Sequence, residues 1–169
     1  MRPVTKPADR DASVEDLFDS AADGGGRRDP ALTDAQVVLE RVERDEIAAR
    51  AARDHLRDGA MIPIIPDATI SPLLHPGELV LAHRGNALLN PPTSDPSLPG
   101  YGGALYLTSR RLVHTGRVVV SIGLEQIRET SLAGERLLLT LDGGEGMSLE
   151  TDQPRVLRVE ISAAQRSLR

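Results

Sequence analysis

The chain has 169 residues, a net charge of −5, 40% hydrophobic residues and no cysteine. Its length predicts one domain with appendages, and the missing cysteines exclude disulfides, thiolate zinc sites and a thiol nucleophile. Only one Phe and two Tyr supply aromatic rings, so we expect a small core built from Leu, Ile and Val.

Charge is distributed unevenly along the chain. Residues 1–58 carry 14 acidic and 10 basic side chains, whereas residues 59–169 carry 11 and 10. A nucleic-acid binder usually has a strongly basic domain or stripe, so we expect no nucleic-acid partner. No apolar run approaches the ~20 residues that cross a bilayer, and the N-terminus lacks a hydrophobic signal core. These features favour a cytoplasmic protein.

Residues 1–31 have the composition of a disordered acidic tail. They combine three prolines with the run Gly24-Gly25-Gly26 and few apolar side chains, too little to offset the entropy of ordering. The one local exception is SVEDLF at 13–18. It is interpreted as a transient turn or, alternatively, as a short linear motif that docks Leu17 and Phe18 on a partner.

Residues 32–58 predict an amphipathic helix. Thr33 and Gln36 form a capping box, and Gly59 follows as a stop signal. The helix carries an apolar stripe that Asp45 and Glu46 interrupt. Either it is a solvated helix lying against the domain or extending from it, or it is a self-association or partner-docking helix. The stripe consists of Val38, Val42, Ala49, Ala52 and Leu56.

Residues 59–77 predict a proline-rich extended arm. Prolines at 63, 66, 72 and 76 exclude both a helix and a central strand. The simplest way to hide the arm's many apolar side chains is to lay them across the domain surface, and the alternative is an exposed docking segment. These side chains are Ile62, Ile64, Ile65, Ile70, Leu73 and Leu74.

From residue 78 the hydrophobic period becomes that of strands. Asp152 and Pro154 then open a helix whose apolar stripe must pack on the sheet, namely Leu157, Ile161, Ala164 and Leu168. Residues 78–169 therefore predict a mainly β domain, a seven-stranded antiparallel barrel or sandwich closed by a C-terminal helix. The expected strands are 79–83, with 86–90 as its continuation or its return, then 104–107, 112–115, 118–122, 126–132, 136–141 and 147–150.

Three short motifs lie within this region: PGELVL at 76–81, GALYLTSRRLV at 103–113 and IGLEQI at 122–127. Over residues 74–168 the chain resembles the GRAM and bacterial pleckstrin-homology-like (PH-like) domains. Those domains show a proline-glycine-glutamate start, a Gly-x-Leu-Tyr-Leu-Thr-x-x-Arg-Leu hairpin and a later leucine-acid-x-isoleucine step. The resemblance implies a PH-like barrel that binds phosphoinositides, proteins or peptides, and fold alone does not choose among these ligands.

The resemblance also implies where a lipid-binding member would hold phosphates, namely on basic residues of the loop between the first two strands. In this chain that loop, 85–103, contains no Lys or Arg and does contain Asp95. Without cations it is poorly suited to a polyphosphoinositide. We therefore expect a non-enzymatic binding or adaptor module for a protein or peptide partner. The alternative is a peripheral module on a weakly anionic membrane surface.

Two groups of residues are candidates for recognition. One is a basic cluster, interpreted either as solvated turn and edge positions or as an anion or acidic-peptide site; it comprises Arg84, Arg110, Arg111, His114 and Arg117. The other would dock apolar side chains on a partner or membrane; it comprises Leu88, Leu89, Leu98 and Tyr101.

No motif indicates an enzyme, a cofactor or a metal. The serines lack a Gly-x-Ser-x-Gly elbow, and the glycine-rich 143–146 segment joins two expected strands, which makes it a hairpin turn. The four histidines have no metal-ligand spacing; they are His55, His75, His83 and His114.

Overall fold

The computed structural model describes residues 30–91 and 100–169. Residues 37–169 form one compact unit, and the described residues 30–36 belong to another. Three expected segments therefore lie wholly or largely outside the described residues: the tail at 1–31, its 13–18 motif and the loop after residue 90.

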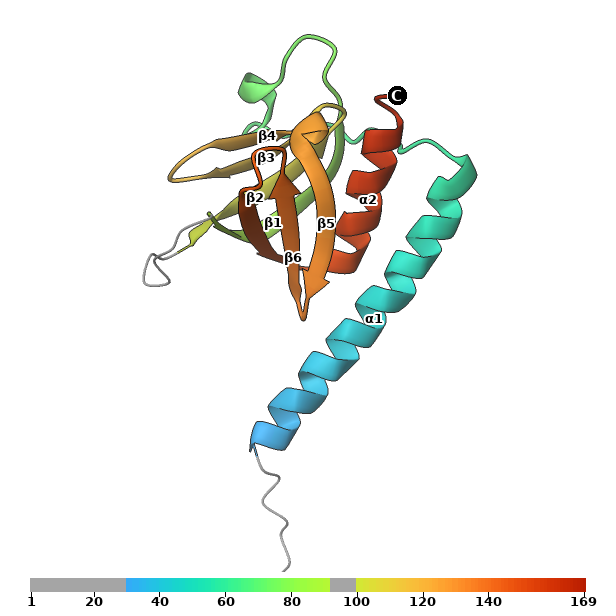
Figure 1. The fold of residues 1–169 in the computed structure, drawn as a ribbon, viewed down its shortest axis with the longest axis vertical. Coiled ribbons are helices and arrows are strands. Elements are labelled where there is room, and N and C mark those ends of the chain that lie inside the picture. The colour runs from blue at the N-terminus through green and yellow to red at the C-terminus, as the bar shows by residue number, and fades with distance from the viewer. Residues whose placement is uncertain (1–29, 92–99) are drawn as a thin grey trace, which may run out of the picture. The chain divides into compact units, whose positions relative to one another are not determined.

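A seven-stranded antiparallel sheet forms the centre of the unit, in the order β4-β3-β2-β1-β7-β6-β5 (Figure 1). This confirms the predicted fold class, mainly β with flanking helices. The strands are β1 (Val80–Asn90), β2 (Tyr101–Thr108), β3 (Arg111–Gly116), β4 (Val120–Gly123), β5 (Ile127–Ala133), β6 (Arg136–Leu141) and β7 (Gly146–Thr151).

Strand β1 joins the two halves of the sheet. It pairs with β2 from Val80 to Leu89, and its last residues, Ala87 to Asn90, also pair with β7. The two expected segments 79–83 and 86–90 are thus one strand, with an irregularity in the pairing between Arg84 and Ala87. Such an irregularity bends a strand without ending it, which allows one strand to serve both halves.

The C-terminal helix α2 (Pro154–Arg166) covers the sheet as predicted. Leu157, Ile161 and Ala164 enter the main core beside aliphatic residues from all seven strands. Leu168 was expected to continue this stripe, but it lies beyond the helix end and is exposed. Every buried member of this core is aliphatic, as the scarcity of aromatic residues predicts.

The start of α2 differs from the prediction. Pro154 is at the first helical turn, but Asp152 is not the cap; the N-cap position is Gln153, at φ 57°, with no side-chain hydrogen bond to the helix. The cap comes instead from Asp45, whose carboxylate accepts the backbone N–H of Arg155 at 2.9 Å and of Val156 at 3.3 Å. These are the groups that an N-cap side chain usually satisfies.

Asp45 belongs to helix α1 (Pro30–Asp58), which confirms the predicted helix and its end before Gly59. The helix begins at Pro30, so Thr33 is inside it and is not its cap. Ala49 and Leu56 of α1 pack against Val156, Val159 and Ala163 of α2. The acidic interruption of the stripe is therefore part of the same interface. Asp45 is only 4% exposed, and its charge is offset there by two helix N–H groups and by the Arg155 guanidinium at 3.5 Å.

The arm from 59 to 77 packs on the sheet only in part. Ile70 is fully buried, while Leu73 and Leu74 are half-buried against the same cluster. Ile62, Ile64 and Ile65 were expected to be hidden too, but all three are exposed, Ile65 by 94%. The prolines explain the difference, because they restrict this stretch to a single bridge, Ile64 to Val80, and a short 3₁₀ helix, η2 (Ser71–Leu73).

Candidate functional site

Arg111, the most conspicuous basic residue of the sequence, is held by contacts within the domain. Its guanidinium contacts the carboxylate of Glu78 at 2.9 and 3.0 Å and donates to the Leu73 carbonyl at 2.6 Å. Thr108 also donates to Glu78, at 2.6 Å. Burial opposes ionisation of Glu78, but the hydrogen bonds from Arg111, Thr108 and the His75 amide outweigh it and lower its pKa to about 2. The PGE and LTxxR motifs thus meet in one buried ion pair.

Two further members of the predicted basic cluster are held inside the domain. Arg84 pairs with Glu160 of α2 at 2.8 Å, and both side chains are largely covered. Burial raises the pKa of Glu160, and the positive charge of Arg84 opposes that rise. His114 is 2% exposed, with its Nε2 3.3 Å from the Ala87 carbonyl oxygen. Arg84 Nε and His114 Nδ1 have no hydrogen-bond partner among the described residues.

The remaining members of this cluster are not neighbours. Arg110 and Arg117 are exposed, but they flank opposite ends of β3, which a strand of that length separates by about 20 Å. The five residues therefore do not form one continuous basic surface.

The predicted apolar docking residues also separate. Leu89 is 1% exposed and lies opposite Leu149 in the core, so the prediction that it docks on a partner is wrong. It fails because β1 continues through this position and turns Leu89 inward. Leu88 is half-buried and Tyr101 is exposed, while Leu98 lies outside the described residues.

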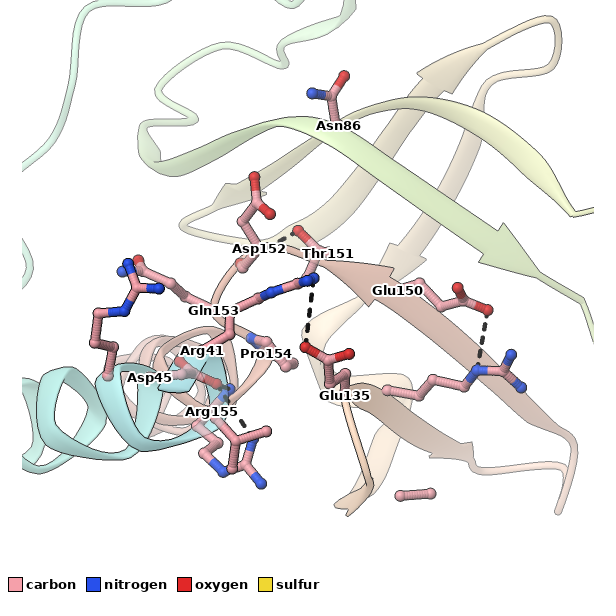
Figure 2. A pocket seen from close by; sticks show the side chains of 14 residues that line it. Arg41, Asp45, Asn86, Glu135, Glu150, Thr151, Asp152, Gln153, Pro154 and Arg155 are labelled. Carbon is pink, nitrogen blue, oxygen red and sulfur yellow. Dashed lines mark hydrogen bonds and ion pairs between the residues drawn. The ribbon is translucent and has the colours of Figure 1, made fainter. Parts of the chain in front are cut away.

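Two open pockets, each of about 620 Å³, lie beside the contact between α1 and α2. The first, the mixed-charge pocket, is shown in Figure 2. Arg41 of α1 reaches toward Glu135 in the turn between β5 and β6, at 3.5 Å. Arg136 pairs with Glu150 at 3.0 Å on the neighbouring strands. Because the acids and arginines here largely neutralise one another, this pocket has little preference for either sign of charge.

The second, which we call the arginine pocket, has a different character. Five arginines line it and no acidic residue does; its lining is Arg53, Arg57, Leu132, Arg155, Arg158, Val159, Ser162 and Arg166. Arg53 and Arg57 come from α1, and the other three arginines come from α2. Those three extend over eleven positions of α2, about 16 Å along the helix axis. The apolar side chains of Leu132 and Val159 lie among them.

The charges of the arginine pocket are only partly balanced. Arg57 pairs with Asp54 at 2.9 Å on the exposed face of α1, and Arg166 donates to the Leu56 carbonyl. Arg158 is exposed, and none of the described residues forms an ion pair or hydrogen bond with its guanidinium. Guanidinium groups suit carboxylate or phosphate oxygens because their N–H groups are arranged in a planar fork. The pocket is therefore equipped to bind an anionic group beside an apolar one.

Sequence reasoning missed the arginine pocket. Arg53 and Arg57 are one helical turn apart, as are Arg155 and Arg158, and this spacing places each pair on one helix face. That signal is present in the sequence, but it does not show that the two faces meet. Their meeting depends on the packing of Ala49 and Leu56 on α2.

Within the described ranges, no group of three or more His, Asp or Glu side chains is placed to hold a metal ion. The helices described are also too short or too polar to cross a membrane.

Comparisons with known proteins assign no family. No family model matches the sequence, and no curated protein matches it. Among solved structures, the fold is similar to the C-terminal domain of an unknown protein from Leishmania infantum, with 15% sequence identity and a TM-score of 0.46. That similarity covers 58% of this chain and 92% of the other.

Proposed function

We propose that the protein is a non-enzymatic binding module whose arginine pocket receives an acidic segment of a partner protein or peptide. The observation that carries this proposal is the lining of the pocket, with five arginines and no acidic residue around about 620 Å³. The seven antiparallel strands followed by a helix support a PH-like class of adaptor, and we place its action in the cytoplasm.

The shape of the pocket favours a peptide over a single small anion. Arg155 and Arg166 are about 16 Å apart along α2, which an extended chain covers in about five residues. Leu132 and Val159 offer an apolar surface between the cations. The preferred ligand is therefore an extended segment with several carboxylates and one central apolar side chain.

The test is fluorescence anisotropy with the full chain and a labelled peptide of sequence Glu-Glu-Leu-Glu-Glu, at several salt concentrations. Arg158→Ala removes an exposed cation of the pocket that pairs with none of the described residues, and we expect about three- to tenfold weaker binding, the range for one lost hydrogen bond of ordinary strength. The matched control is Arg110→Ala, an exposed arginine that belongs to the basic cluster predicted from the sequence and does not line the pocket. It should bind as the wild type does.

Two results would count against the proposal. If Arg110→Ala weakens binding and Arg158→Ala does not, recognition belongs to the β3 hairpin. If the peptide does not bind but vesicles of phosphatidylserine and phosphatidylcholine sediment the protein in a salt-sensitive way, the membrane alternative is favoured.

A further inference from the structure

Glu46 reaches both walls of the arginine pocket. It lies on the same face of α1 as Arg53, because seven residues are about two helical turns. Its Oε1 is 3.5 Å from Nη2 of Arg53, and its Oε2 is 3.4 Å from Nε of Arg155 on α2. One carboxylate thus bridges two arginines that belong to different helices.

This bridge is loose. Charge-assisted hydrogen bonds between guanidinium and carboxylate measure about 2.7–2.9 Å, and both contacts of Glu46 are longer. The side chain of Glu46 is 41% exposed, and that of Arg53 is 51% exposed. An exposed ion pair of this kind contributes little to stability, so an incoming carboxylate can replace it at little cost.

Arg155, in contrast, is held in place without Glu46. Its side chain is largely covered and also contacts Asp45, and its backbone N–H is fixed by the same carboxylate. The position between Arg53 and Arg155 therefore stays suited to an anion when Glu46 moves away.

We propose that the Glu46 carboxylate occupies the position that an acidic side chain of the partner takes, so that Glu46 acts as an internal competitor that weakens binding. This inference rests on the proposed function of the arginine pocket. It assigns one anion position within that pocket and identifies the residue that controls access to it. The competing explanation is that Glu46 is only a surface ion pair that stabilises α1.

The experiment compares Glu46→Gln with Glu43→Gln in the full chain. Both variants remove one negative charge from α1, but Glu43 is exposed and has no ion pair or hydrogen bond with the described residues. With the Glu-Glu-Leu-Glu-Glu peptide, we expect Glu46→Gln to bind about three- to fivefold more tightly than the wild type, the gain from removing one exposed ion-pair partner. Glu43→Gln should change the binding free energy by less than half as much as Glu46→Gln does.

A second measurement separates competition from a structural role. In the wild type, peptide addition should shift the NMR signals of the arginine Nε–H groups of Arg53 and Arg155. In free Glu46→Gln the same signals should already have moved away from their wild-type positions. Thermal unfolding should show the variant folded, within about 2 °C of the wild type.

The possible outcomes distinguish this inference from the function on which it rests. If the wild type binds the peptide and the two variants tighten binding equally, Glu46 acts only through overall charge and the inference is wrong. Weaker binding by Glu46→Gln would also overturn it. If none of the three proteins binds the peptide, the proposed function itself fails.

Discussion

Replacing Asp45 with Ala should destabilise the protein more than any other change of a single carboxylate in α1. The substitution removes the acceptor for two backbone N–H groups at the start of α2. Loss of an N-cap costs about 1 kcal/mol, and a buried N–H left unpaired adds about 1–3 kcal/mol. We therefore expect a loss of about 2–4 kcal/mol, which for a domain of this size lowers Tm by about 8–16 °C.

Urea denaturation followed by circular dichroism measures this loss, and Asp152→Ala is the matched control. Asp152 is the cap that the sequence predicts, but in the structure it is exposed and does not cap the helix. Its removal should change the free energy of unfolding by less than about 0.5 kcal/mol. Asp45→Asn keeps an acceptor oxygen and should lose about half as much as the Ala variant. If Asp152→Ala proves as damaging as Asp45→Ala, the assignment of the cap is wrong.

Two further predictions concern the sheet. The pKa of Glu78, lowered to about 2 from 4.5, stabilises the fold above pH 4.5, and this contribution of about 3 kcal/mol is lost as the pH falls from about 5 to 2. Urea titrations across that range should show the loss in the wild type and its absence in Glu78→Gln. Gly103→Ala would place a Cβ against the backbone of Thr115, whereas a Cβ at Gly102 meets open space. Calorimetry should show a loss of about 2–3 kcal/mol for Gly103→Ala and much less for Gly102→Ala; equal losses would contradict the packing described.

Local patterns explain why most of the fold could be predicted from the sequence. The alternation of Leu137 and Leu139 with outward residues is a period of two, and it determines both the strand and its buried face. The sequence does not decide whether β1 is continuous, because the Gly85-Asn86 step is equally typical of a turn and of a bulge. Only the pairing of Ala87 with both Gly103 and Thr151 decides it.

The candidate site was less predictable because it depends on contacts between distant segments. Arg111 is conspicuous in the sequence, but in the structure its guanidinium forms an ion pair with Glu78. Asp45 interrupts an apolar stripe, and no local rule shows that a helix N-terminus 110 residues away needs its carboxylate. The arginine pocket depends on that same interface. Its residues could be placed on helix faces but not brought together.

The hydrogen bonds between Asp45 and the start of α2 also have a consequence for the order of folding. Residues that are 110 positions apart must meet before the cap can form, and contacts of such long separation are costly to close and slow to form. During synthesis, α1 emerges before every strand, while α2 follows the last of them. The apolar face of α1 that contains Ala49 and Leu56 therefore stays uncovered until the whole sheet has left the ribosome. Stable docking of α1 is expected to be a late step of folding, and the arginine pocket forms with it.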